Sequence, residues 1–428
     1  MARLGIMGMT LADTIVVGQL APDELPHQAL ALAPVAVLQV ATVGLLQGVQ
    51  VLAARSVGEN NPKAAGVVLK RGLVIALVAG LLAAAALWIG GARIFTLLGI
   101  APELAEPSAR VMNVLAWSLP LHLVFTAAAF FMEAVKKPSA GTAILWLGNG
   151  ANLGFDILLV PDFGAMGSAW ATVATRGLLF VAIAIWIWRL RERRDFGVTR
   201  RNKLGPNYRA LMTIGFAAAV SYAVEAGAFS GMTVIAGRIG GAEVAAYQIL
   251  INVSSLVFMV AMGMSTATAV LVSEAFGAKS QRDVARAGWT GLGLNFVGSM
   301  LFAVGVVVFA HQIARGYTTD TALAALIAAH IWLCAIAFPP DGAQVVAANA
   351  LRARGDNWFP TFSHIAAYLV VMPALGFWLA ELEGMGVAGL LLAIFWASVL
   401  SGGVLVLRWA YVTWMSGRVA TGHSGNSI

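Results

Sequence analysis

The chain has 428 residues, of which 60% are hydrophobic and only 11% are charged. Soluble domains carry about twice that charged fraction, and no single core could bury so much apolar surface. The composition therefore excludes a soluble globular protein. The single cysteine, Cys334, also excludes an internal disulfide and a cysteine-based metal site.

Apolar runs of about 20 residues recur along the chain, and each can cross a hydrocarbon core of about 30 Å as a helix. They lack the period-2 alternation of barrel strands. The pattern therefore predicts an all-α polytopic membrane protein. Twelve transmembrane helices are expected, at residues 1–20, 28–54, 66–91, 108–132, 138–160, 165–190, 209–237, 243–273, 285–311, 321–350, 357–380 and 385–415.

The positive charges gather on one side of this predicted membrane topology. If both termini are cytoplasmic, 22 of the 27 lysine and arginine residues fall in the cytoplasmic segments, including the segment "LRARGDNW" after the tenth span. Cytoplasmic segments of membrane proteins carry such an excess. We therefore expect a multi-pass protein of the plasma or inner membrane, in contact with the lipid bilayer. The net charge of +7 then indicates topology and not a nucleic-acid partner.

The two halves of the chain are related by an internal repeat. The basic linker 189–209 separates an N-terminal lobe, 1–195, from a C-terminal lobe, 196–428, each with six spans. A constant shift of 219 residues aligns landmarks of the two halves: Gly58 with Gly277, Pro120 with Pro339, and Gly167 with Gly386. Because six is an even number, the repeats run parallel. The expected architecture is two pseudo-symmetric six-helix bundles with a central cleft.

Four acidic residues fall deep inside predicted spans, away from the span ends: Asp13, Asp156, Glu225 and Asp341. A charge at the centre of a membrane helix costs about 2.5–3.5 kcal/mol on insertion scales. Such residues normally face a bundle interior or a water-filled cavity, and they mark ion or substrate pathways. These four residues are therefore the first candidates for a functional site.

In the N-terminal half, Asn149, Asn152 and Asp156 share one stripe of a helix in "LGNGANLGFDILL". Amide and carboxylate oxygens can coordinate a hard cation such as Na⁺, and they can hydrogen-bond a protonated acid. The alternative is a polar clasp that only holds helices together.

In the C-terminal half, Glu225 follows Tyr222 in "SYAVEAGAF", and Asp341 follows two prolines in "FPPDGAQ". Prolines inside a helix remove hydrogen bonds and distort it, so a broken helix is expected before Asp341, with Gln344 one turn later. The repeat aligns Asp341 with His122, which is either a proton carrier or a neutral histidine in a helix interface.

The sequence has no GxxxxGK[ST] phosphate loop, no HExxH and no GxSxG. These absences argue against ATP hydrolysis and against a hydrolase or metalloenzyme. We therefore expect no enzyme activity and no cofactor.

Several segments resemble the multidrug and toxic compound extrusion (MATE) family, in particular its NorM-type branch. They are "DTIVVGQL" in the first span, "GLLQGVQVLAARSVGENN" in the second, "GFDILLV" with "FGAMGSAWATVATR" in the fifth and sixth, "AVEAGAF" in the seventh and "DGAQVVAANALRARGD" in the tenth. Their order over essentially the whole chain carries the resemblance, since each segment alone is a loose match.

The resemblance implies a secondary antiporter that exports amphipathic, cationic organic compounds, such as drugs or toxins, in exchange for Na⁺ or H⁺. It implies an N-lobe cation site at Asp13, Asn152, Asp156 and Thr172, and a C-lobe site at Glu225 and Asp341. Na⁺ could bind at either carboxylate cluster, and Asn149, His122, Tyr222 and Gln344 are accessory candidates. The two lobes need no partner, so a monomer is expected.

The chain departs from the family pattern at one point, and two alternative functions stay open. Only twelve residues precede Asp13, fewer than is usual in the family, so a marginal first span is expected. One alternative function is a flippase for a lipid-linked or other anionic lipid, which a strongly cationic cavity would favour. The other is a membrane enzyme or scaffold that transports nothing.

Overall fold

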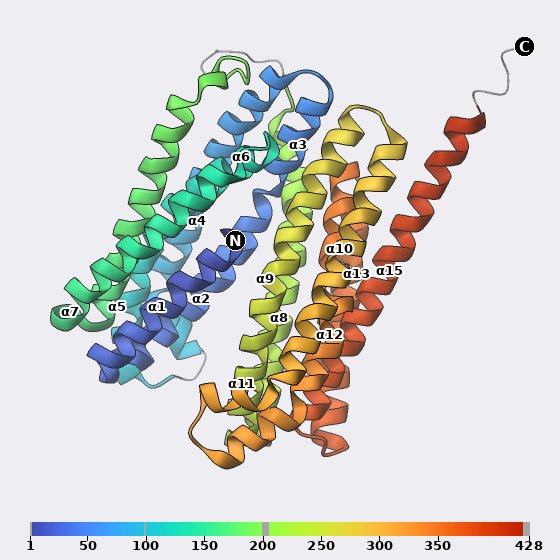
Figure 1. Ribbon diagram of the computed structural model, residues 1–428. Helices are drawn as coiled ribbons and strands as arrows, with labels where there is room; N and C mark the ends of the chain where they lie inside the picture. Colours follow the sequence, from blue (N-terminus) through green and yellow to red (C-terminus); the bar gives the residue numbers. More distant parts are fainter. Residues whose placement is uncertain (1, 98–99, 199–204, 423–428) are drawn as a thin grey trace, which may run out of the picture. The chain divides into compact units, whose positions relative to one another are not determined.

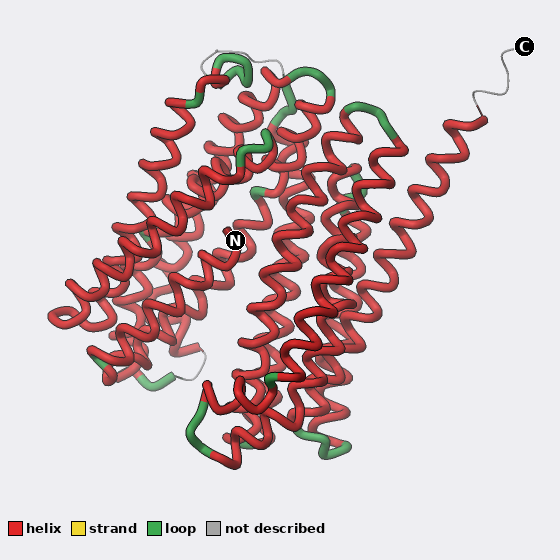
Figure 2. The backbone as a smooth tube through the Cα atoms, in the orientation of Figure 1, coloured by secondary structure: helices red, strands yellow, loops and turns green. Residues whose placement is uncertain are grey.

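The computed structural model describes residues 2–97, 100–198 and 205–422. In these ranges the regular structure is entirely helical, as the backbone colouring in Figure 2 shows. Contacts divide the chain into two compact units, Met1–Ala219 and Val220–Ile428. The predicted lobe boundary at 195/196 stays a prediction, and residues 199–204 of the predicted linker lie outside the described residues.

The first unit begins with a helix that contains Asp13, followed by a short 3₁₀ turn, Pro22–Glu24. Its helices are α1 (Ala2–Leu20), α2 (Leu25–Leu45), α3 (Gln47–Gly58), α4 (Pro62–Leu97), α5 (Pro102–Ala116), α6 (Ser118–Ala134) and α7 (Pro138–Arg189). A second 3₁₀ turn, Arg191–Arg193, follows α7. The predicted second span corresponds to α2 and α3, and the predicted fourth span falls on α5 and α6.

The 52-residue helix α7 is a hairpin of two helical arms. A straight helix of that length would measure about 78 Å, more than twice the membrane core. Gly164 reverses the chain with φ +56°, and a Cβ at Gly167 would lie 2.4 Å from the Leu159 carbonyl oxygen. The two arms therefore lie side by side, seen as the teal and green arms of α7 in Figure 1. They are the predicted fifth and sixth spans.

Helix α8 (Tyr208–Ile239) starts in the first unit and continues into the second. The second unit continues with α9 (Gly241–Gly277), α10 (Gln281–Val308), α11 (Ala310–Tyr317), α12 (Thr321–Arg354), α13 (Trp358–His364), α14 (Met372–Phe377) and α15 (Val387–Gly422). Two π-helical segments, Ile365–Val371 and Trp378–Leu382, flank α14 and join it to its neighbours in one continuous span.

The expected break before Asp341 is wrong. Helix α12 continues through Pro339 and Pro340. Each proline removes only one N–H, and neighbouring helices in a membrane bundle supply the packing that keeps such a helix intact. The irregular backbone lies instead in the π-helical segment that contains Tyr368, a type of distortion that is frequent at functional sites.

Ten helical segments of the described chain are long and apolar enough to cross a membrane. The α7 hairpin counts once among them although it has two arms, and the 19-residue α1 is not among the ten. Small residues allow the helices to approach closely in both units. A Cβ at Gly80 would lie 2.5 Å from the Pro120 Cα, and a Cβ at Gly288 would lie 2.0 Å from the Trp409 ring.

Candidate functional site

The first unit brings together all four side chains that the sequence assigns to an N-lobe site. Asp13 comes from α1, Asn152 and Asp156 from the first arm of α7, and Thr172 from its second arm. All four are buried, with Asn152 and Asp156 fully enclosed. Thr172 Oγ1 donates to Asp13 Oδ2 at 3.2 Å, and Asn152 Nδ2 donates to Asp156 Oδ2 at 3.3 Å. The α7 hairpin therefore forms two sides of the cluster and α1 forms the third.

The two carboxyl groups of this cluster interact directly with each other. Two carboxylates in contact repel unless they share a proton or a cation. Buried oxygens lacking a donor among the described residues include Asp13 Oδ1, Asn152 Oδ1 and Asp156 Oδ1. Such acceptors suit a shared proton and a hard monovalent cation equally well.

Gln28 and Ser168 extend this cluster, and no sequence pattern predicted either residue. Gln28 Nε2 on α2 donates to Ser168 Oγ at 3.1 Å, and Ser168 in turn interacts with Asp156. Both side chains are at least 96% buried, and Gln28 Oε1 has no donor in the described chain. One glutamine near the start of an apolar run carries no periodic signal, so only tertiary contact identifies it.

The accessory candidates of the first unit take other positions. Asn149 Nδ2 donates to the Gly5 carbonyl of α1 at 2.8 Å, which fixes α1 against α7. His122 is buried on α6, where Thr126 Oγ1 donates to its backbone carbonyl. The residues of the predicted stripe therefore have different partners: Asn149 donates to a backbone carbonyl, and Asn152 donates to the carboxyl group of Asp156.

In the second unit, Asp341 on α12 accepts two hydroxyl hydrogen bonds. Tyr368 OH donates to Asp341 Oδ1 at 3.4 Å, and Ser398 Oγ donates to the same oxygen at 3.3 Å. Gln344 Nε2 donates to Glu225 Oε1 at 3.3 Å, and Gln344 also interacts with Asp341. Gln344 therefore bridges the two predicted acids.

Asp341 also lines a mostly apolar cavity. The other lining residues are Phe229, Ile251, Ser254, Leu333, Cys334, Ala337, Phe338, Leu391 and Ile394. Two aromatic rings and several aliphatic side chains thus surround one carboxyl group. Apolar walls with a single acid offer both kinds of contact that an amphipathic cation makes. The cavity itself has a volume of only about 30 Å³, so such a ligand enters it only when the surrounding helices move apart.

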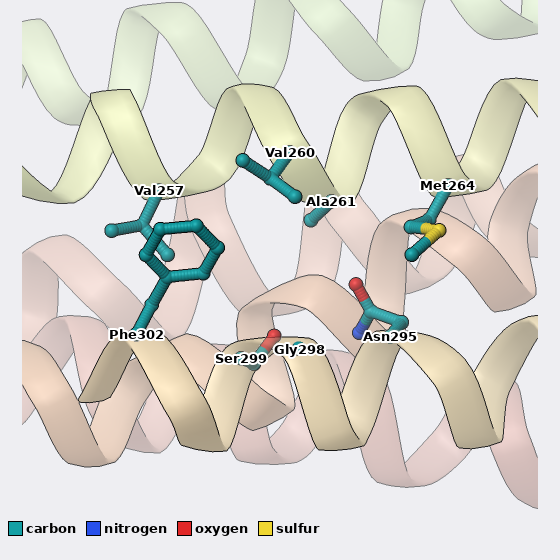
Figure 3. A pocket seen from close by; sticks show the side chains of 8 residues that line it. All are labelled: Val257, Val260, Ala261, Met264, Asn295, Gly298, Ser299 and Phe302. Carbon is teal, nitrogen blue, oxygen red and sulfur yellow. The ribbon is translucent and has the colours of Figure 1, made fainter. Parts of the chain in front are cut away.

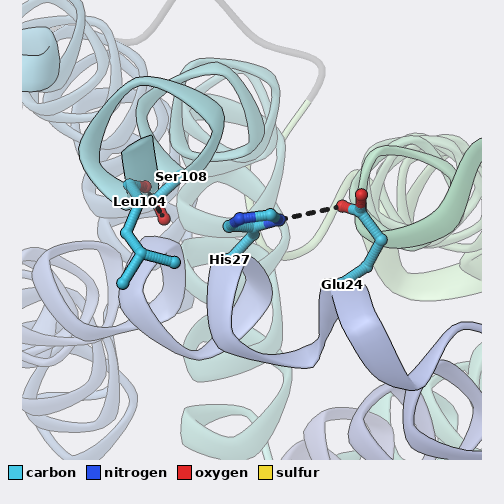
Figure 4. Close-up of polar contacts among 4 residues, drawn as sticks. All are labelled: Glu24, His27, Leu104 and Ser108. Atoms are coloured by element: carbon cyan, nitrogen blue, oxygen red, sulfur yellow. Dashed lines mark hydrogen bonds and ion pairs between the residues drawn. The ribbon is translucent and has the colours of Figure 1, made fainter. Parts of the chain in front are cut away.

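Two further polar features contain none of the predicted acids. A small cavity between α9 and α10, shown in Figure 3, is lined by Asn295 and Ser299 among apolar side chains. At the start of α2, the His27 ring lies 3.2 Å from Glu24 Oε2, as Figure 4 shows. Glu24 packs against Gly164 at the turn of the α7 hairpin. Across the residues that the structure describes, no three His, Cys, Asp or Glu side chains form a group that could hold a metal ion.

The ten apolar helices of the described chain define a multi-pass membrane protein that holds two acid clusters, a buried one at Asp13 and Asp156 and a half-buried one at Glu225 and Asp341. The MatE family model matches residues 1–158 and 217–378, and the chain belongs to this family of multidrug and toxic compound extrusion transporters. It is therefore a transporter and not an enzyme, as expected, and it is a multi-pass protein of the inner membrane.

Two relatives extend this comparison over nearly the whole chain. A probable multidrug resistance protein NorM of Caulobacter vibrioides is 40% identical over 427 residues, covering 98% of this chain and 91% of that protein. A probable multidrug resistance protein NorM of Deinococcus radiodurans is 30% identical, covering 96% and 92%. The predicted resemblance to the NorM-type branch is thereby confirmed.

Solved structures share the fold at low sequence identity. A transporter of the MOP superfamily from Pyrococcus furiosus is 18% identical, with a TM-score of 0.89 over 97% of this chain and 94% of that chain. A eukaryotic MATE transporter is 16% identical, with a TM-score of 0.88 over 97% and 95%. The predicted fold class, an all-α polytopic membrane protein, is confirmed.

Proposed function

We propose that this protein is a secondary antiporter that exports amphipathic, cationic organic compounds in exchange for Na⁺ or H⁺. The observation that carries the proposal is the position of Asp341 in the wall of an apolar cavity with Phe229 and Phe338. The names of the NorM relatives, which are called probable multidrug resistance proteins, agree with such substrates.

Coupling follows from competition for a limited number of negative charges. When Asp341 carries a proton or Na⁺, an organic cation in the cavity has no charge to pair with. When the organic cation binds, the coupling ion must leave. Each ligand favours the helix packing in which its own contacts are best, and the two packings open to opposite sides of the membrane.

The N-lobe cluster of Asp13, Asn152, Asp156 and Thr172 is proposed as the second site of the coupling cation. Two carboxyl groups in contact exchange a proton or Na⁺ readily, because either ion relieves their mutual repulsion. Asp13 Oδ1, Asn152 Oδ1 and Asp156 Oδ1, for which the described part of the chain offers no donor, supply ligands for that ion. We further propose that both termini are cytoplasmic and that the protein works as a monomer of two lobes.

Transport in proteoliposomes tests the proposal. Ethidium efflux is measured with an imposed gradient of pH or of Na⁺, for the wild type, Asp13→Asn and Asp341→Asn. We expect at least a tenfold loss of gradient-driven efflux in each variant. Glu103→Gln, which changes an exposed acid at the start of α5, is the matched control and should transport normally. Unchanged efflux in both aspartate variants would overturn the proposed sites.

Substrate occupancy of the cavity has its own assay, because Cys334 is the single cysteine of the chain and lines the cavity with Asp341. A small thiol reagent should label Cys334 more slowly when tetraphenylphosphonium is present. In Asp341→Asn this protection should disappear. Equal protection by a neutral apolar analogue would show that charge plays no part in recognition.

A further inference from the structure

Arg352 is a buried positive charge at the end of α12 that the sequence pattern assigns to a cytoplasmic segment. Only 1% of the Arg352 surface is exposed, so protein encloses the guanidinium. A buried arginine is costly unless charged or polar groups pair with it. Its partners therefore identify its role.

The guanidinium of Arg352 is directed toward α8, the helix that contains Glu225. Arg352 Nη2 donates to Ser221 Oγ at 2.6 Å, and Nη1 donates to Asn349 Oδ1 at 3.3 Å. Arg352 Nε finds no acceptor in the part of the chain that the structure describes. Ser221 and Glu225 are four residues apart, so about one helical turn separates the guanidinium from the acid.

The charged and titratable groups that face Arg352 come from two neighbouring elements. Tyr222 and Glu225 face it from α8, and His364 faces it from α13. The His364 ring also contacts the Tyr368 ring edge-on, with centroids 5.7 Å apart. Glu225 is the carboxylate of this set, and Asp341 lies beyond it, hydrogen-bonded to Tyr368 and Ser398.

We propose that Arg352 is the built-in counter-cation of Glu225, so that the C-lobe site accepts one exchangeable cation, held at Asp341. The charge of Glu225 is then balanced by Arg352, and Asp341 alone exchanges a proton, Na⁺ or an organic cation. This inference rests on the proposed function and gives the two C-lobe acids different roles. It also makes Arg352 a positioning residue that opposes cation binding.

Cation affinity of the purified protein is the direct test, with tetraphenylphosphonium as the probe. Arg352→Gln removes the charge, and we expect affinity to rise about tenfold, since a unit charge one to two turns away is worth at least that factor at an effective dielectric constant of about 20. Arg352→Lys keeps the charge and should stay within about threefold of the wild type. The double variant Arg352→Gln with Glu225→Gln should return to wild-type affinity.

A second route neutralises the same charge while keeping the arginine. Ser221→Asp places a carboxylate against the guanidinium and should raise affinity as Arg352→Gln does, whereas the nearly isosteric Ser221→Asn should not. Unchanged or weaker binding in both Arg352→Gln and Ser221→Asp would overturn the inference, and if Arg352→Gln does not fold, Ser221→Asp decides alone. A separate experiment tests the proposed antiport: normal efflux by Asp341→Asn would overturn it, whatever the cation affinity of the Arg352 variants.

Discussion

The hydrogen bond between Gln28 and Ser168 allows a sharp test of the N-lobe cluster. Ser168→Ala removes the acceptor of Gln28 Nε2 and the hydroxyl that interacts with Asp156. Gln28 is only 4% exposed, and its Oε1 already lacks a donor in the described residues. The variant therefore leaves the glutamine amide buried with neither polar atom satisfied.

The expected loss of stability in Ser168→Ala follows from the number of polar atoms left without a partner. One unsatisfied buried polar group costs about 1–3 kcal/mol, so Ser168→Ala should lower the free energy of unfolding by about 2 kcal/mol. Gln28→Leu removes the whole amide and fills a similar volume, so it should cost less than Ser168→Ala. The double variant should be more stable than Ser168→Ala alone, because no orphaned amide remains.

Unfolding of the purified transporter by SDS titration in mixed micelles measures the four proteins of this cycle. The titration is repeated with and without Na⁺, since a ligand that binds the folded state stabilises it. If Gln28 Oε1 is a ligand of the coupling ion, Gln28→Leu should also weaken the Na⁺-dependent stabilisation. Strictly additive costs in the double variant would refute the reasoning, because the two side chains would then act independently.

Two predictions concern packing and surface charge. Gly288→Ala places a Cβ 2.0 Å from the buried Trp409 ring and should cost about 1–3 kcal/mol in thermal unfolding, whereas Gly293→Ala, with open space on the same helix, should be neutral. Equal melting temperatures of the two variants would contradict the close packing of Gly288 against Trp409. Lys137 Nζ donates to Glu192 Oε1 at 2.6 Å, and this hydrogen bond lowers the pKa of Glu192 below its ordinary value of 4.5. The pair thus stabilises the fold above the ordinary pKa and loses its effect as pH falls through the lowered one. Lys137→Met should return the pKa toward 4.5 in an NMR titration of Glu192, and an unchanged value would rule the pairing out.

The sequence predicts the helices well because lipid demands long apolar runs, and these runs are local. It also identifies the acids of both clusters, since Asp13, Asp156, Glu225 and Asp341 stand out by their cost in an apolar span. It fails at Pro339 and Pro340, where local chemistry predicts a break and the surrounding packing keeps α12 continuous.

What the sequence by itself determined is therefore the membrane environment, the helical class and the set of acids inside the spans, all of which follow from local composition. Only the tertiary structure decided which groups surround those acids. Ser168 and Tyr368 are ordinary polar residues until folding brings them to the carboxyl groups of Asp156 and Asp341, and Gln28 until folding brings it to Ser168. Arg352 resembles a loop charge in the sequence, and only the packing of α12 against α8 buries it beside Ser221. The physical reason is that insertion into lipid depends on each segment alone, whereas charge pairing depends on which segments meet.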